Sequence, residues 1–281
     1  MARIRDRSPL ITFLRLLAWL LPGNYLKTVI YLNLIARPRD AVRAMLNTFY
    51  RMDHIYGVLR ECKRSYKGNF TILEFGTAQG YSFTKMLYAT KYLGLDDRVV
   101  VHTFDSFEGL PTTADPAEQR HWEEGAFKGD YEVLDAHCRK RYRNYKIHKG
   151  WFEDTLVESV FIELEERPPI LVWIDCDYYE PARLVLERLI PYIPTGCVIY
   201  FDDVDAEFGS RLAGEVKLIY EINNGLFGGQ IELVPDRSLS LDSNRIYRFI
   251  NRKHDVQYAR LTNRYWGAGI PRSLSNDSPL P

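Results

Sequence analysis

The fold is decided by two segments, Ile170-Leu-Val-Trp-Ile-Asp-Cys-Asp177 and Cys197-Val-Ile-Tyr-Phe-Asp-Asp203. Each begins with an apolar run that is typical of a buried strand, and each run ends in carboxylates. A helix-like segment separates them, so the two strands are predicted to be parallel neighbours. The carboxyl ends of parallel strands meet at one edge of an open sheet, where ligands bind. Because clustered carboxylates repel one another unless they share a cation or a proton, this edge is predicted to hold a hard metal ion.

Strand and helix patterns alternate on both sides of these segments. Two late strands, at 231–234 and 245–250, are joined only by a turn region and should form an antiparallel hairpin. The pattern predicts an α/β fold: a Rossmann-like sheet, mostly parallel with a late antiparallel strand, flanked by helices. The other strands are predicted at 70–75, 99–104, 145–148, 169–174 and 197–201, and the helices near 80–93, 131–142, 153–165, 180–192 and 211–223.

The 281 residues are predicted to form three regions: an N-terminal helical extension at 1–65, the α/β domain at 66–265, and a flexible tail at 266–281. The apolar run from Leu10 to Leu21 follows a basic start, but it is too short to span a bilayer and no small-residue cleavage site follows it. Two interpretations of the extension stay open. Its helices pack on the domain or over its active site, or they lie on a membrane surface. Contact between copies of the chain is a further expectation for it.

Composition excludes some partners. Lys+Arg and Asp+Glu both total 37, so net charge gives no reason to expect nucleic acid. Four scattered cysteines form no C-x-x-C pair, which argues against a structural zinc site and against a disulfide framework. We therefore expect a reducing, cytoplasmic location.

The turn after the first strand, Glu74-Phe-Gly-Thr-Ala-Gln-Gly80, indicates a nucleoside site. Its glycines would let the backbone approach a ligand closely, and the following helix offers N–H groups. A structural turn alone would also explain them, and G-x-G-x-x-G spacing is absent. Asp105, at the end of the second strand, could accept both hydroxyls of a ribose. The candidate contacts here are Glu74, Gly76, Thr77, Gly80, Ser82, Asp105 and Ser106.

A third candidate segment, Gly150-Trp-Phe-Glu-Asp-Thr-Leu156, follows the predicted strand at 145–148. Trp151 or Phe152 could stack on an adenine face, and Asp154 could accept its exocyclic amine. A helix cap with its aromatic residues in the core explains the same residues equally well.

Taken in order, these motifs resemble the macrocin O-methyltransferase family, which includes sugar methyltransferases of aminocoumarin biosynthesis. The resemblance covers roughly residues 70–205, and its most specific element is Phe104-Asp-Ser-Phe-Glu-Gly-Leu-Pro111. The strand layout is also that of class I methyltransferases. The resemblance implies S-adenosylmethionine as methyl donor, a divalent metal (usually magnesium), and a hydroxyl of a sugar or similar natural product as acceptor.

The resemblance also implies roles for the acidic residues. The metal ligands would be Asp175, Asp202 and Asp203, and Asp175 would also serve as the base. Asp202 follows Asp175 by 202 − 175 = 27 positions, which suits a strand, helix and strand that return to the same edge. Strand alternation predicts that Asp177 turns away from this group or lies above it, so Asp177 is the weaker candidate for a ligand. His121 and His148 are weaker candidates for the base.

The sequence therefore predicts an S-adenosylmethionine-dependent and Mg²⁺-dependent O-methyltransferase acting on a sugar or another natural-product small molecule. The alternatives are a non-catalytic scaffold protein of the same fold, docked through its N-terminal helices, and a nucleotide-dependent oxidoreductase, which the missing glycine spacing disfavours. The chain departs from the family at Tyr178-Tyr-Glu-Pro181, where the family has Leu-Tyr-Glu-Ser. This difference does not touch the metal ligands but can alter the substrate wall. The N-terminal 65 residues match none of the family's motifs, so the acceptor stays open.

Overall fold

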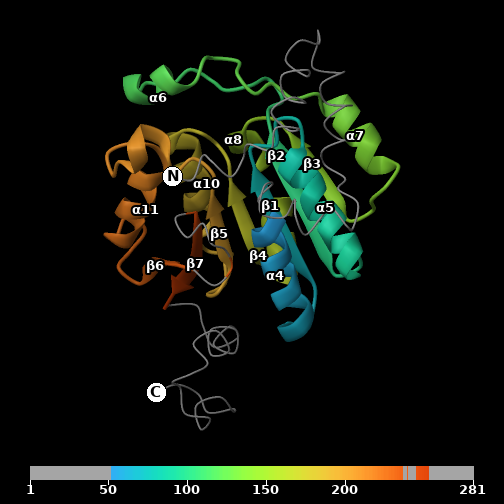
Figure 1. Ribbon diagram of the computed structural model, residues 1–281. Coiled ribbons are helices and arrows are strands. Elements are labelled where there is room, and N and C mark those ends of the chain that lie inside the picture. The colour runs from blue at the N-terminus through green and yellow to red at the C-terminus, as the bar shows by residue number, and fades with distance from the viewer. Residues whose placement is uncertain (1–51, 237–238, 240–244, 253–281) are drawn as a thin grey trace.

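A seven-stranded sheet forms the centre of the computed structural model, which describes residues 52–236, 239 and 245–252 (Figure 1). The strand order is β3-β2-β1-β4-β5-β7-β6. The first five strands pair in parallel, whereas β7 runs antiparallel to both of its neighbours. The predicted class I, Rossmann-like fold and its late antiparallel hairpin are confirmed. The strands are β1 (Phe70–Phe75), β2 (Val99–Asp105), β3 (Tyr145–Lys149), β4 (Pro169–Ile174), β5 (Val198–Phe201), β6 (Ile231–Pro235) and β7 (Ile246–Asn251).

Helices cover both faces of the sheet. Two short elements lie in connections instead: α6 (Pro116–His121) follows β2, and the 3₁₀ helix η3 (Ala206–Gly209) follows β5. One face packs against α4 (Met52–Ser65), α5 (Tyr81–Leu93) and α7 (Tyr131–Arg139). The other face packs against α8 (Phe152–Thr155), α9 (Glu158–Glu166), α10 (Tyr179–Leu189) and α11 (Gly214–Asn223).

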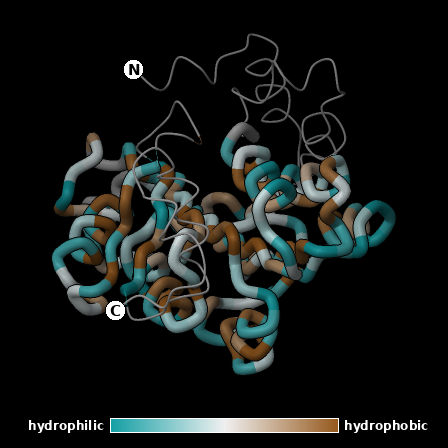
Figure 2. The backbone as a smooth tube through the Cα atoms, turned by 90° about the horizontal axis from the view of Figure 1, so that it is seen from below, coloured by the Kyte–Doolittle hydropathy of each residue, from teal (hydrophilic) through white to brown (hydrophobic). Residues whose placement is uncertain are grey.

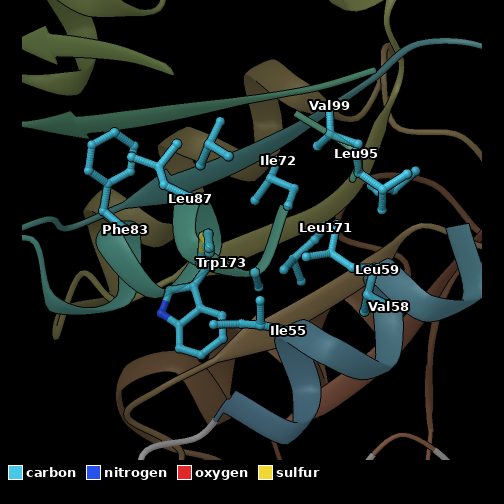
Figure 3. Close-up of a cluster of buried hydrophobic side chains, with 14 of the residues drawn as sticks. Ile55, Val58, Leu59, Ile72, Phe83, Leu87, Leu95, Val99, Leu171 and Trp173 are labelled. Atoms are coloured by element: carbon cyan, nitrogen blue, oxygen red, sulfur yellow. The ribbon is translucent and has the colours of Figure 1, made fainter. Parts of the chain in front are cut away.

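The first core cluster lies between the sheet and helices α4 and α5 (Figure 3). Ile72 of β1, Trp173 of β4, Phe83 of α5 and Leu59 of α4 all belong to this cluster, and each is at most 2% exposed. Each such side chain contributes about 1.5–3 kcal/mol by leaving water. Helix α4 falls inside the predicted N-terminal extension, yet it shares this core with the sheet.

The second core cluster lies on the opposite face. Phe75 of β1 stacks on Phe104 of β2 with ring centroids 4.7 Å apart, and Phe104 stacks on His148 of β3 at 4.2 Å. Ile174 and Phe201, the last residues of β4 and β5, are fully buried here. Apolar stretches of the chain alternate with hydrophilic ones that form outer turns (Figure 2), as expected for two cores on either side of one sheet.

Two connections differ from the sequence prediction. The helix expected at 153–165 is divided into α8 and α9, because Leu156 leaves helical geometry at φ −81° and ψ 74°. The long insertion at 106–130, where no helix was predicted, contains helix α6.

Several predictions fall outside the described residues. Residues 1–51 hold most of the predicted extension, and residues 266–281 hold the predicted tail, so the domain boundaries stay predictions. Among the residues that the structure describes, no helix has the length and apolar character needed to cross a bilayer.

Candidate active site

Three carboxylates converge where β4 and β5 end. Ile174 lies opposite Phe201 in the parallel register, so Asp175 and Asp202 leave adjacent strands side by side. The Asp202 N–H donates to the Ile174 carbonyl at 3.0 Å, which continues the pairing one residue further. One oxygen from each of Asp175, Asp202 and Asp203 lies within 4.8 Å of the others, and all three residues are half-buried. The structure thus brings together the three residues that were predicted to bind metal.

Aromatic residues of the two strands orient this group. The Tyr200 hydroxyl donates to Asp202 Oδ1 at 2.8 Å, and Trp173 Nε1 lies 3.5 Å from Asp175 Oδ2. The Trp173 and Tyr200 rings stack with centroids 3.6 Å apart. Because both rings are buried, the two carboxylates are held by rigid neighbours rather than by mobile surface residues.

Two further acids face the same group. Asp177 adopts left-handed backbone geometry (φ 62°) and hydrogen-bonds Asp203, so it contacts the group without being one of its three converging carboxylates. Burial and repulsion from Asp203 and Asp202 raise the pKa of Asp177 to about 9. Glu215, fully buried in the first turn of α11, accepts the Asp203 N–H at 2.8 Å. Burial is the main cause that raises the pKa of Glu215 well above the usual range, and repulsion from Asp203 is the next. Sequence reasoning missed Glu215, because nothing in the pattern of α11 indicates that its first turn lies beside the carboxylates.

This donor set suits a hard divalent cation. The three converging ligands are all carboxylate oxygens, which Mg²⁺ prefers, and their mutual repulsion is relieved by positive charge. Within the described part of the chain, no other group of three or more His, Cys, Asp or Glu residues meets the same distance limit.

The glycine turn after β1 lies beside this group. Gly76 has φ 91°, and a Cβ there would lie 1.8 Å from the Asp175 carbonyl oxygen. The residue must be glycine because the ends of β1 and β4 approach so closely. Gly80 (φ 77°) then precedes α5 as its N-cap. The close approach of the two strand ends is therefore sufficient to explain the glycine at position 76, an alternative that the sequence left open.

Asp105 closes this turn from β2. Its Oδ2 accepts the N–H groups of Thr77 at 2.7 Å and Ala78 at 2.8 Å, and its Oδ1 accepts that of Phe107 at 2.5 Å. Ser106 makes a local contact, since its Oγ accepts the Glu108 N–H at 3.1 Å. Asp105 thus fixes the shape of the glycine turn, and its contact with a ribose stays a prediction.

A buried polar network supports the turn from below. Glu74 is fully buried, accepts a hydrogen bond from the Thr103 hydroxyl at 2.5 Å, and hydrogen-bonds Ser82. The hydroxyls of Thr77 and Thr103 also hydrogen-bond each other. Burial raises the pKa of Glu74 to about 7. Since Glu74 has no exposed surface, its predicted role at the cofactor would have to act through these neighbours.

The two aromatic residues that follow β3, Trp151 and Phe152, lie in different surroundings. Phe152 packs edge-on against the Phe75 ring at 5.5 Å, whereas Trp151 is 41% exposed. Asp154 is exposed beside it. Trp151 and Asp154 therefore have surface that a ligand can contact, and Phe152 is largely occupied by the core.

His148, one of the two histidine candidates for the base, lies away from the carboxylates. His148 Nε2 lies 3.2 Å from His102 Nδ1 on the face of the sheet covered by α9, and burial lowers the pKa of His148 to about 4. His121 belongs to α6, but its side chain lies outside the described part of the structure.

Comparisons with known proteins agree with this fold. Residues 73–204 match the family model of a methyltransferase domain. Among solved structures, CalS11, a calicheamicin methyltransferase, is 20% identical, with 82% of this chain and 92% of that chain covered and a TM-score of 0.52. The O-methyltransferase NovP is 18% identical, with 73% and 81% covered and a TM-score of 0.50. No curated protein sequence matches significantly. Over residues 73–204 the chain is therefore similar to a methyltransferase domain, and its sheet is that of the class I methyltransferase fold.

Proposed function

We propose that the protein transfers a methyl group from S-adenosylmethionine to a hydroxyl of a sugar or another natural-product small molecule, and that it needs Mg²⁺. The observation that carries the proposal is the convergence of Asp175, Asp202 and Asp203 within 4.8 Å, one strand away from the glycine turn. Methyl transfer from a sulfonium needs a donor site, a hydroxyl made nucleophilic, and a group that takes its proton.

Residues of this chain would supply each part. The turn from Gly76 to Gly80, with Asp105 behind it, would hold the methyl donor, and the exposed Trp151 would cover its adenine. The three aspartates would hold the cation, which when bound lowers the pKa of an acceptor hydroxyl and orients it. Asp175 borders both parts, because its carbonyl contacts the turn and its carboxylate joins the cluster. It is therefore our candidate for the group that accepts the proton.

The acceptor class is proposed from the comparisons. CalS11 is described as a calicheamicin methyltransferase and as a TDP-rhamnose 3′-O-methyltransferase, and NovP as an O-methyltransferase. Because this chain shares its fold with those proteins, a glycosyl hydroxyl is the first acceptor to test, and TDP-rhamnose is a concrete probe.

The test has two parts. Calorimetry with S-adenosylhomocysteine measures binding at the donor site, and we expect saturable one-to-one binding. Transfer of a labelled methyl group to a panel of sugars and glycosides, TDP-rhamnose included, is then measured with EDTA and again after Mg²⁺ is restored. Absence of cofactor binding would refute the methyltransferase proposal. Full activity in excess EDTA would refute the metal requirement alone.

A further inference from the structure

The insertion at 106–130 crosses the carboxyl edge of the sheet, from the end of β2 to a position above α10 and α11, and α6 forms its far end (Figure 1). Both ends of the insertion are tied to the glycine turn. At its start, Asp105 accepts the Thr77 N–H, and near its end a Cβ on Gly129 would lie 1.9 Å from the Ala78 carbonyl oxygen. The insertion therefore leaves from the proposed donor site and returns to it.

Glu118 fixes the far end. Although it belongs to a short surface helix, it is only 6% exposed. Its Oε1 accepts the N–H of Tyr179, the first residue of α10, at 2.7 Å. Its Oε2 accepts the hydroxyl of Thr113 at 2.9 Å. The first N–H groups of a helix have no partner within the helix and carry partial positive charge, so a buried carboxylate is a strong acceptor there.

This contact lies beside the carboxylate cluster. Tyr179 follows Asp177 by two residues, and between them Tyr178, which is 1% exposed, lies with its hydroxyl 3.5 Å from the Trp122 carbonyl oxygen. Glu118 is thus attached to the segment that leaves the cluster, and Trp122 lies over the same segment.

The insertion presents two aromatic rings. Trp122 and Phe127 form an edge-to-face pair with centroids 5.0 Å apart. Phe127 is 49% exposed and adopts left-handed geometry (φ 60°), which a phenylalanine rarely does. Such backbone geometry persists only where the surrounding structure imposes it, and it is concentrated at ligand sites.

We propose that Glu118 is a positioning residue that fastens the insertion to the first turn of α10, so that Trp122 and Phe127 form the acceptor-side wall of the site. An aromatic wall suits the apolar face of a glycosyl ring. The identity of the ligand in this inference rests on the proposed function, whereas the attachment of the insertion to α10 does not.

The attachment is tested by hydrogen–deuterium exchange of the full chain, read by mass spectrometry. Glu118→Ala removes both acceptors, and we expect the amides of 106–130 to exchange at least about tenfold faster, while those of β1 and β4 are unchanged. Glu118→Gln keeps an oxygen that accepts the Tyr179 N–H, so it should stay within about twofold of the wild type. Glu123→Gln, an exposed carboxylate of the same insertion, is the matched control.

Unchanged exchange of 106–130 in Glu118→Ala would overturn the proposal. If that variant does not fold, Thr113→Val replaces it, because it removes one of the two bonds to Glu118 and should give a smaller increase in the same peptides. Equal acceleration in Glu118→Gln and Glu118→Ala would also overturn it, since the accepting oxygen would then be irrelevant.

The wall is tested by kinetics with the acceptor found in the methyl-transfer panel. We expect Glu118→Ala to raise KM for the acceptor at least about tenfold with a smaller change in kcat, and to leave the affinity for S-adenosylhomocysteine within about twofold. An unchanged KM would overturn the wall. If the wild type binds no S-adenosylhomocysteine, the proposed function fails, and the exchange result still decides the role of Glu118.

Discussion

The variant Gly76→Ala tests the close approach of β1 and β4, and Gly94→Ala is its matched control. Both glycines have positive φ, 91° and 65°, so each variant carries the left-handed penalty of about 1–2 kcal/mol. At Gly94 an added Cβ meets nothing within 4 Å, whereas at Gly76 it lies 1.8 Å from the Asp175 carbonyl oxygen. Ordinary contact begins at 3.4 Å, so one strand end must move by about 3.4 − 1.8 = 1.6 Å. Overpacking of this kind adds about 1–3 kcal/mol.

The assay is urea unfolding followed by circular dichroism, with the free energy of unfolding extrapolated to water. We expect Gly94→Ala to lower it by about 1–2 kcal/mol and Gly76→Ala by about 2–5 kcal/mol, the sum of the two penalties. Because the clash displaces the backbone of Asp175, Gly76→Ala should also weaken Mg²⁺ binding, measured by calorimetry, whereas Gly94→Ala should not. Losses that agree within about 0.5 kcal/mol would refute the close approach of the two strands.

Three further predictions concern the site and its surroundings. Asp175→Asn should abolish methyl transfer and weaken Mg²⁺ binding at least about tenfold, while the affinity for S-adenosylhomocysteine stays unchanged. The control is Asp97→Asn, which changes an exposed carboxylate. Normal turnover by Asp175→Asn would contradict both roles of Asp175. Burial lowers the pKa of His148 from 6.5 to about 4, so stability is complete above pH 6.5 and falls by up to about 1.4 kcal/mol per pH unit between those values. Urea unfolding near pH 7 and near pH 5 should show this loss, and His148→Gln should reduce it; equal loss in both proteins would contradict the assignment. Trp151→Ala should weaken S-adenosylhomocysteine binding about fivefold without loss of stability. Phe152→Ala should instead lower the free energy of unfolding by about 2–3 kcal/mol. The reverse pattern would contradict the assignment of Trp151 to the ligand and Phe152 to the core.

The sequence predicted the strands and the edge of the sheet where the acids meet. Strands β1 and β4 begin and end where the apolar runs do, because a buried strand of a parallel sheet must be apolar on both faces. Parallel pairing then places Asp175 beside Asp202 without any knowledge of side-chain positions. This part of the site could be predicted because it follows from topology alone.

Other features depend on contacts that no local pattern encodes. Strand alternation does not describe the place of Asp177, because β4 has already ended and the backbone of Asp177 is left-handed. Glu118 and Glu215 look like ordinary surface acids of polar segments, and only contacts across 61 and 12 residues respectively bury them. The glycine at position 76 suggested a ligand, but the nearest atom to its missing Cβ belongs to the protein itself.

The place of β5 in the sheet determines when the acidic group can assemble during synthesis. Asp202 and Asp203 directly follow this strand, which is held between β4 on one side and β7 on the other. The Phe201 N–H donates to the carbonyl of Arg245, whose guanidinium pairs with Asp205 at 2.6 Å. The ribosome releases residues 70–201 well before 245–251, and contacts between distant segments form late. We therefore expect the acidic group to reach its final geometry among the last folding steps, so that a cation would bind a finished domain rather than guide its folding.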